Sequence, residues 1–228
     1  MSDQKKASLA KGFSERAKWF NNRASCIFPV FIDEFSDTHL VFQDYWGWKN
    51  NIEQVFCILR FRDSLGESIL STQIEIMLHN EIQVSNLIKD RHLINGGTVE
   101  LEIISPENIG YPFPAILAFY VTKDHKSVVH AAGRILNSNE KHAEGKWKES
   151  NFTITLEQDF NPFICLFYGQ HVKKESEIKL FFRDHLDNAL LLEKVSKLKP
   201  SAFGSEILYI KDFLSEDEFR LLEEKKVF

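Results

Sequence analysis

The sequence contains a series of short apolar runs, each about the length of one β-strand and rich in Val, Ile and Phe. Turn signals separate the runs, such as the segments 63–68, 95–97 and 105–110. No amphipathic helix of useful length interrupts the series, which disfavours βαβ units and a parallel sheet. The sequence therefore predicts an all-β fold of antiparallel strands. The expected strands are 26–32, 39–46, 54–61, 67–76, 98–104, 114–121, 127–136, 151–158, 163–169, 177–184, 188–195 and 205–214.

One twelve-residue segment occurs twice in similar form. LRFRDSLGESIL (59–70) returns without a gap as LFFRDHLDNALL (180–191). In both copies a strand ends at Arg-Asp, a polar turn of four to five residues follows, and an apolar strand leaves. This pattern predicts a β-hairpin. The flanks agree in order, because FIDEF and LEQDF precede the two copies and VSNLI and IKDFL follow them. We therefore expect a duplicated unit.

The duplication predicts two tandem antiparallel β-sandwich units, at 27–146 and 147–228, after an N-terminal helical segment at 1–26. The second unit has no counterpart of residues 98–135, so it must borrow surface from the first unit or share a sheet with it. Whether the two copies form one domain or two is left open.

Short helices are expected at both ends. Residues 5–22 place Leu9, Phe13, Ala17 and Phe20 on one stripe, which is typical of a docked helix or of a basic amphipathic surface anchor. Near the C-terminus, Ser215 and Glu218 have the spacing of a capping box, with Phe219 and Leu222 on one helix face.

Composition excludes several classes of protein. The net charge of -5 gives no general attraction to nucleic acid or to an anionic membrane. Three cysteines, Cys26, Cys57 and Cys165, form no C-x-x-C pair and lie in apolar runs, so we expect small core residues in a reducing compartment. No signal peptide or membrane span is indicated, so a cytoplasmic location is expected.

The repeated segments RFRDSLGESIL with VSNLI, and FFRDHLDNALL with IKDFL, carry a resemblance. A strand, F-x-D at a turn, an apolar strand and a short polar-apolar segment resemble the sensory rhodopsin transducer family and similar small bacterial β-sandwich domains. The likeness covers about 60 residues in each copy, and the duplication and the segment 119–140 depart from it. It implies a non-enzymatic sandwich that binds a partner or a small ligand.

Aromatic residues gather in VFQDYWGWKNN (41–51), where Tyr45, Trp46 and Trp48 stand among amides and charged side chains. Flat rings with polar edges suit stacking on sugars or gripping a peptide. The alternative is that Trp46 and Trp48 fill the bottom of the core.

A second polar group is expected at 125–147. If 127–136 is one strand, His130 and Arg134 share a face, with small residues between them that leave space above it. Asn139 and Glu140 would lie on the adjoining loop, and Arg134 would bind an anionic or hydroxyl-bearing group.

Motifs for a cofactor or a nucleophile are absent, and we predict no metal and no cofactor. His79 and Glu81 with the distant His130 resemble an iron-binding triad, but His79 is expected in a turn and the context disfavours the site. The two Arg-Asp pairs are interpreted as turn-forming residues, with the carboxylate accepting backbone amides two residues on.

The leading prediction is a non-catalytic β-sandwich protein that binds a protein partner or a carbohydrate-like ligand, with a homo-oligomer formed through an edge strand as a subclass. The alternative is an enzyme acting on a carbohydrate or small acid, with His130 and Glu140 as acid and base and Arg134 as the anion clamp.

Overall fold

The structure is a computed structural model of the whole chain. It describes residues 21–90, 94–110, 114–130, 133–136, 156, 162–170, 172 and 175–225. The chain divides into two compact units, Met1–Ile135 (unit 1) and Leu136–Phe228 (unit 2). The helix expected at 5–22 falls mainly on residues outside the described ones, and so does the expected boundary between residues 146 and 147.

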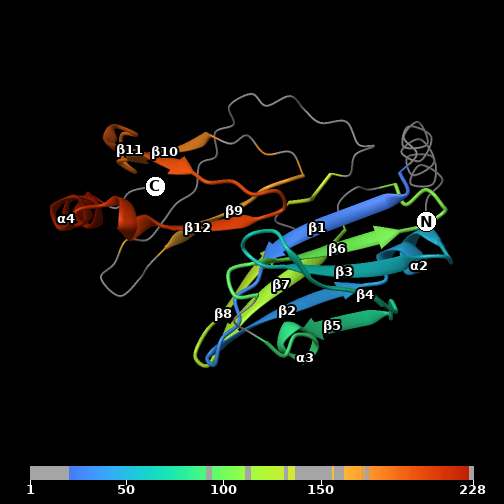
Figure 1. Cartoon of the computed structure of the whole chain (residues 1–228). Helices are drawn as coiled ribbons and strands as arrows, with labels where there is room; N and C mark the ends of the chain where they lie inside the picture. The colour runs from blue at the N-terminus through green and yellow to red at the C-terminus, as the bar shows by residue number, and fades with distance from the viewer. Residues whose placement is uncertain are drawn as a thin grey trace. The chain divides into compact units, whose positions relative to one another are not determined.

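Unit 1 contains two four-stranded antiparallel sheets, which Figure 1 shows as two layers. The first sheet has the order β1-β6-β3-β4 and the second has the order β5-β2-β7-β8. The strands are β1 (Arg23–Pro29), β2 (Ser36–Gln43), β3 (Phe56–Arg62), β4 (Ser68–Ile74), β5 (His79–Gln83), β6 (Thr98–Ile104), β7 (Ile116–Thr122) and β8 (Lys126–His130). The all-β class predicted from the sequence is confirmed.

One apolar core holds unit 1 together, with side chains from both sheets. Cys57, Leu59 and Phe61 of β3 are fully buried, as the alternation along this strand predicted, and Leu40 of β2 and Ile116 of β7 reach the same cluster from the other sheet. Burial of so many large apolar side chains, at about 1.5–3 kcal/mol each, is the main favourable term in the stability of unit 1.

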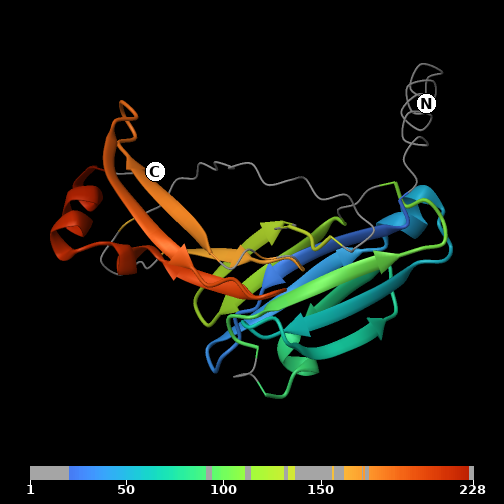
Figure 2. The ribbon, with the colours of Figure 1, turned by 45° about the horizontal axis from the view of Figure 1, so that its top comes forward.

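The connections 44–55 and 75–78 lie at one end of unit 1, together with residues 105–110 after β6 and 114–115 before β7. They join the ends of β2, β4 and β6 to the starts of β3, β5 and β7, and these strand ends are neighbours in the ladders. The short helix α2 (Tyr45–Asn50) lies in the first of these connections, and Figures 1 and 2 show it near the place where β6 finishes. We call this end of unit 1 the α2 end.

Unit 2 contains two two-stranded antiparallel sheets, β10-β11 and β12-β9, followed by a helix. Its elements are β9 (Phe163–Phe167), β10 (Ser176–Arg183), β11 (Leu190–Leu198), β12 (Ser205–Tyr209), the one-turn helix η2 (Ile210–Phe213) and α4 (Glu216–Lys225). A small apolar core forms around Phe182, Ile210 and Leu222. The predicted capping box is confirmed: the Ser215 amide donates to Glu218 at 2.8 Å and the Glu218 amide to the Ser215 hydroxyl at 3.3 Å.

The repeated segments 59–70 and 180–191 form the same kind of β-hairpin in both units. β3 pairs with β4 and β10 pairs with β11, and each hairpin has an irregularity after its phenylalanine, between Phe61 and Arg62 and between Phe182 and Arg183. The correspondence extends beyond the hairpin, because β2 pairs with β5 as β9 pairs with β12. A one-turn helix then follows in each unit, α3 (Val84–Leu87) after β5 and η2 after β12. Unit 2 thus repeats the four strands β2 to β5.

The Arg-Asp pairs form the turns of these hairpins, as the sequence predicted. The Asp63 carboxylate accepts the amide of Leu65 at 3.0 Å, and the Asp184 carboxylate accepts the amide of Leu186 at 2.8 Å. In each turn the preceding arginine donates to a turn carbonyl. The gapless alignment is wrong by one residue after the turn, because Phe61 faces Leu70 whereas Phe182 faces Leu192.

Several expected boundaries were wrong. β2 stops at Gln43 because the Asp44 side chain accepts the Gly47 amide at 2.8 Å and starts α2. His79, expected in a turn, opens β5 and faces Gln43. The strand expected at 205–214 ends at Tyr209 and continues as η2. The strand expected at 127–136 ends as β8 at His130.

Candidate functional site

The aromatic segment 45–48 divides between core and surface. Trp46 is only 3% exposed and belongs to the core of unit 1, whereas Trp48 is 70% exposed. Tyr45 packs against the core, and the Lys49 amine lies 4.7 Å from the centre of its ring. A cation therefore lies over one face of Tyr45, and Trp48 alone is widely exposed to solvent.

Three further large apolar side chains lie at the α2 end, as Trp48 does. Phe56 opens β3, and Met77 and Leu78 occupy the connection before β5; all three are exposed. We call Trp48, Phe56, Met77 and Leu78 the apolar end surface. Trp, Phe and Met are enriched in protein interfaces, and an apolar group of this kind on a small protein is typical of an interaction site.

Hydrogen bonds hold the connection 75–78 in place. The buried Asn80 side chain accepts the Met77 amide at 2.9 Å and donates to the Met77 carbonyl at 2.6 Å and to the Phe42 carbonyl at 3.4 Å. Met77 and Leu78 are therefore presented by a backbone fixed to the sheet, which lowers the entropy that a partner must remove.

Backbone bonds hold α2 in the same way. The Asp44 side chain caps its first turn, and Asn51 closes it in the left-handed region at φ 52°. The Asn51 and Ile52 amides donate to the carbonyls of Gly47 and Trp46 at 3.2 Å each. With Trp46 in the core, the backbone that carries Trp48 is held from both sides.

His130 and Arg134, which were expected on one strand face, lie beside different sheets. His130 is exposed and faces Leu117 at the edge of the second sheet. The Gly133 carbonyl instead accepts the Ile27 amide of β1, in the first sheet, at 3.0 Å. Half-buried Arg134 donates to the Ser25 hydroxyl at 3.4 Å. The chain thus leaves β8 before Arg134, and Asn139 and Glu140 lie outside the described residues.

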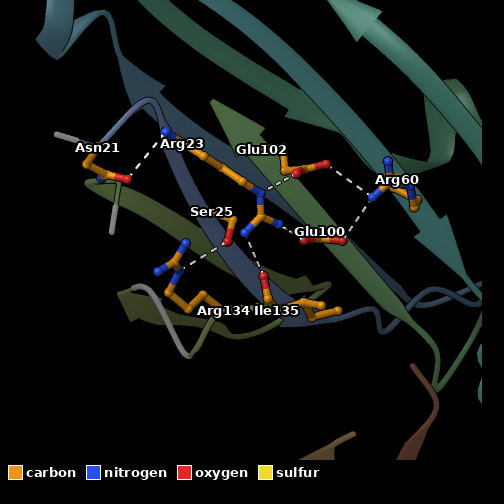
Figure 3. A network of polar contacts seen from close by, with 8 residues as sticks. All are labelled: Asn21, Arg23, Ser25, Arg60, Glu100, Glu102, Arg134 and Ile135. Atoms are coloured by element: carbon orange, nitrogen blue, oxygen red, sulfur yellow. Dashed lines mark hydrogen bonds and ion pairs between the residues drawn. The ribbon is translucent and has the colours of Figure 1, made fainter. Parts of the chain in front are cut away.

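A buried ionic network lies on the outward face of the first sheet (Figure 3). Arg23 donates to Glu102 at 2.5 Å, to Glu100 at 3.0 Å and to the Ile135 carbonyl at 2.8 Å. Arg60 donates to the second oxygens of the same two glutamates, at 3.2 and 3.1 Å. Glu100 is only 2% exposed.

Electrostatics assign this network a structural role. Burial raises the pKa of Glu100, Glu102 adds to the rise, and Arg23 and Arg60 oppose it. Two arginines bridge the two carboxylates, so these oxygens are already engaged. The network fastens residues 133–135 across β1, together with the bonds of Gly133 and Arg134.

A second polar cluster lies along β2 and β5. The Asp37 carboxylate accepts the Ser85 hydroxyl at 2.5 Å and the Gln83 amide at 2.7 Å, while His39 lies 3.1 Å from Glu81. Ser85 donates to Asp37 and not to His39, so these residues do not form a nucleophile and its base.

A shallow depression of about 460 Å³ lies between η2 and α4 in unit 2. Its charged lining is mixed, with Lys211 and Arg220 beside Glu216 and Glu223. Two basic and two acidic side chains together favour neither an anion nor a cation, so we assign no ligand to this depression.

The described residues include no group of three or more His, Cys, Asp or Glu side chains that could hold a metal. Burial raises the pKa of the Cys57 and Cys165 thiols to about 12 each, and burial also raises the pKa of Cys26. Cys26 and Cys57 are fully buried core residues, as predicted. Every helix in the described ranges is too short or too polar to cross a lipid bilayer.

Sequence reasoning found Trp48 but missed Phe56, Met77 and Leu78. The signal was present in the run Ile76-Met77-Leu78, where three consecutive apolar residues break the alternation between two strands. Such a run in a short connection cannot all turn inward, and here Met77 and Leu78 face solvent.

Comparison with protein-family models, with curated proteins and with solved structures finds no match to this chain. The resemblance of the two hairpins to the sensory rhodopsin transducer family therefore stays a prediction.

Proposed function

We propose that the protein is a non-catalytic, cytoplasmic binding protein whose apolar end surface docks a protein partner. The observation that supports this proposal is the exposure of Trp48, Phe56, Met77 and Leu78 at one end of unit 1. Hydrophobic stabilisation favours covering such a group, and a rim of charged residues, Lys49, Glu53 and Glu75, would surround the contact.

A protein partner is favoured over a sugar by the kind of side chain exposed. A sugar-binding platform needs flat aromatic faces, but Trp46 is interior and Lys49 lies over Tyr45. Flexible Met77 and branched Leu78 suit the irregular apolar surface of a protein. We expect Trp48 to be the anchor, because buried tryptophans dominate the binding energy of many interfaces.

The test is site-specific photo-crosslinking in an extract of the source cells. A photoreactive amino acid is placed at position 48 and, in a second variant, at position 35. Phe35 is the matched control, because it is also 70% exposed but precedes β2 and so lies at the opposite end of that strand. We expect a protein adduct at position 48 that is absent at position 35.

The protein in the adduct is identified, and its affinity for the wild type and for two variants is then measured. Binding of the identified protein to the Trp48→Ala variant should be weaker by about 30-fold or more, as for an anchor residue, while Phe35→Ala binds as the wild type does. Equal adducts at both positions, or an adduct only to residues 1–20 of the same chain, would contradict the proposal.

A further inference from the structure

The described residues of unit 2 repeat half of the strand pairing of unit 1. In unit 1, β6 pairs along the second edge of β3 from Phe56 to Arg62, and β7 pairs along the second edge of β2. β10 and β9 are the counterparts of β3 and β2, yet no strand in the described part of the chain pairs with their second edges. As far as the described residues go, β10 therefore presents a row of backbone N–H and C=O groups to any strand that fits it.

The edge strands of unit 1 carry features that discourage such pairing. β4 exposes Ser68, Ser71 and Gln73, β5 and β8 have five residues each, and the Ile27 amide of β1 is bonded to Gly133. β10 differs, because it has eight residues and its outward-facing Phe181 is 41% exposed. The edge of β10 that no described strand pairs with is thus long and apolar enough to hold a partner strand.

The sequence of β10, SEIKLFFR, fits a second copy of itself. We propose that two copies of this chain pair through β10 as antiparallel strands about a two-fold axis at Leu180. In this register Glu177 faces Arg183 of the second copy, Ile178 faces Phe182 and Lys179 faces Phe181. The two hairpins then form one four-stranded sheet, β11-β10-β10-β11.

The charges of β10, together with the number of residues that can pair, favour this register. Facing residues of an antiparallel pair lie on the same side of the sheet. In a pair of identical strands, the two-fold axis must therefore lie at a residue that faces its own copy. An axis at Lys179 places Lys179 opposite itself, and an axis at Phe181 places Lys179 opposite Arg183. Both put like charges together, which destabilises the pair. An axis at Ile178 places Glu177 opposite Lys179 but pairs only residues 176–180 of β10, whereas the axis at Leu180 pairs residues 177–183 and places Glu177 opposite Arg183.

The inner side of the paired strands would also continue the core of unit 2. Phe182 is buried and Leu180 packs against the same cluster, so the face that carries Ile178, Leu180 and Phe182 is already apolar. This inference is independent of the proposed function, because it uses unit 2 and a different partner.

The experiment is a charge exchange followed by analytical ultracentrifugation of the full chain. The wild type should sediment as a dimer of twice the chain mass of 26.5 kDa. Glu177→Arg or Arg183→Glu alone puts like charges opposite each other and should raise the dimer dissociation constant by about 10-fold or more. An equimolar mixture of the two single variants, and the double exchange in one chain, should both restore the dimer.

The matched control is Glu193→Lys in β11, an exposed charge that the proposed interface does not use. It should leave the dimer unchanged, and circular dichroism of each variant verifies that the hairpin is folded. A wild type that is monomeric at every accessible concentration overturns the proposal. A dimer that the single exchanges do not weaken, or that the double exchange does not restore, overturns it as well.

Discussion

Removal of Arg23 should destabilise unit 1 strongly. The Arg23→Ala change deletes three hydrogen bonds, to Glu102, Glu100 and the Ile135 carbonyl, and leaves two buried carboxylates with Arg60 as their remaining bridge. Breaking a buried ion pair by removing one partner costs about 3–5 kcal/mol. Because Arg60 still contacts both glutamates, we expect the lower end, about 3 kcal/mol, or about 12 °C in Tm for a domain of this size.

Arg60→Ala is the matched control on the same two carboxylates. The Arg60 side chain is 28% exposed, so water can replace part of its contacts, and we expect a loss of only about 1 kcal/mol. Urea unfolding followed by tryptophan fluorescence measures both changes, because Trp46 lies in the core of unit 1.

The effect of Arg23→Ala should also depend on pH. The folded-state pKa of Glu100 is raised by burial, and loss of Arg23 raises it further. A raised pKa means that the folded state holds its proton more readily than the unfolded chain, so the associated stability is lost as pH rises through the folded-state value. The variant should therefore approach the wild type at acidic pH and fall further below it as pH rises through the folded-state pKa of Glu100. A pH-independent loss below about 1 kcal/mol would refute the reasoning.

Three further changes follow from single contacts. Trp46→Ala should cost about 3–5 kcal/mol of unfolding free energy in urea, since the ring is a core residue. Gly97→Ala should cost about 1–3 kcal/mol, because a Cβ would lie 2.1 Å from the Arg62 carbonyl oxygen; Gly169→Ala, with no atom within 4 Å, should be neutral. Hydrogen bonds from a lysine and from the cap serine lower the pKa of Glu218 to about 2, so its contribution is present above the ordinary carboxyl pKa and is lost as pH falls through about 2. The helix signal of Glu218→Gln should lack this acid transition in circular dichroism.

The fold was predictable where local chemistry and pattern agree. Alternation along 55–61 identified the buried face of β3, and the Arg-Asp repeat identified both hairpins, because an aspartate heading a turn satisfies backbone amides wherever it stands. The segment 98–135, which was expected to have no counterpart in the second copy, contains β6, β7 and β8 of unit 1.

Most of the errors came from contacts between residues far apart in sequence, and one came from a missed local helix cap. Nothing local indicates that the chain leaves the second sheet after His130 and bonds to β1 at Gly133, 106 residues from Ile27. Asp44 could have been recognised as a helix cap, but the aromatic and β-prone residues around it hid the signal. The ionic network was not predicted, because strand order decides that Arg23, Glu100 and Arg60 meet.

The candidate site was half predictable. Tyr45, Trp46 and Trp48 look alike in the sequence, and only the packing of α2 separates the core tryptophan from the exposed one. Phe56, Met77 and Leu78 lie at the same end of unit 1 as Trp48 because of the strand order, which no single segment of the sequence indicates.

Oxidative footprinting of the protein in its own cells tests the central claim most directly. Met77 is the only methionine besides Met1, and both it and Trp48 react readily with hydroxyl radicals. If the apolar end surface docks a partner, Met77 and Trp48 should be oxidised more slowly in cells than in the purified protein, with Phe35 unchanged. Equal rates for Met77 and Trp48 in both settings would contradict the account.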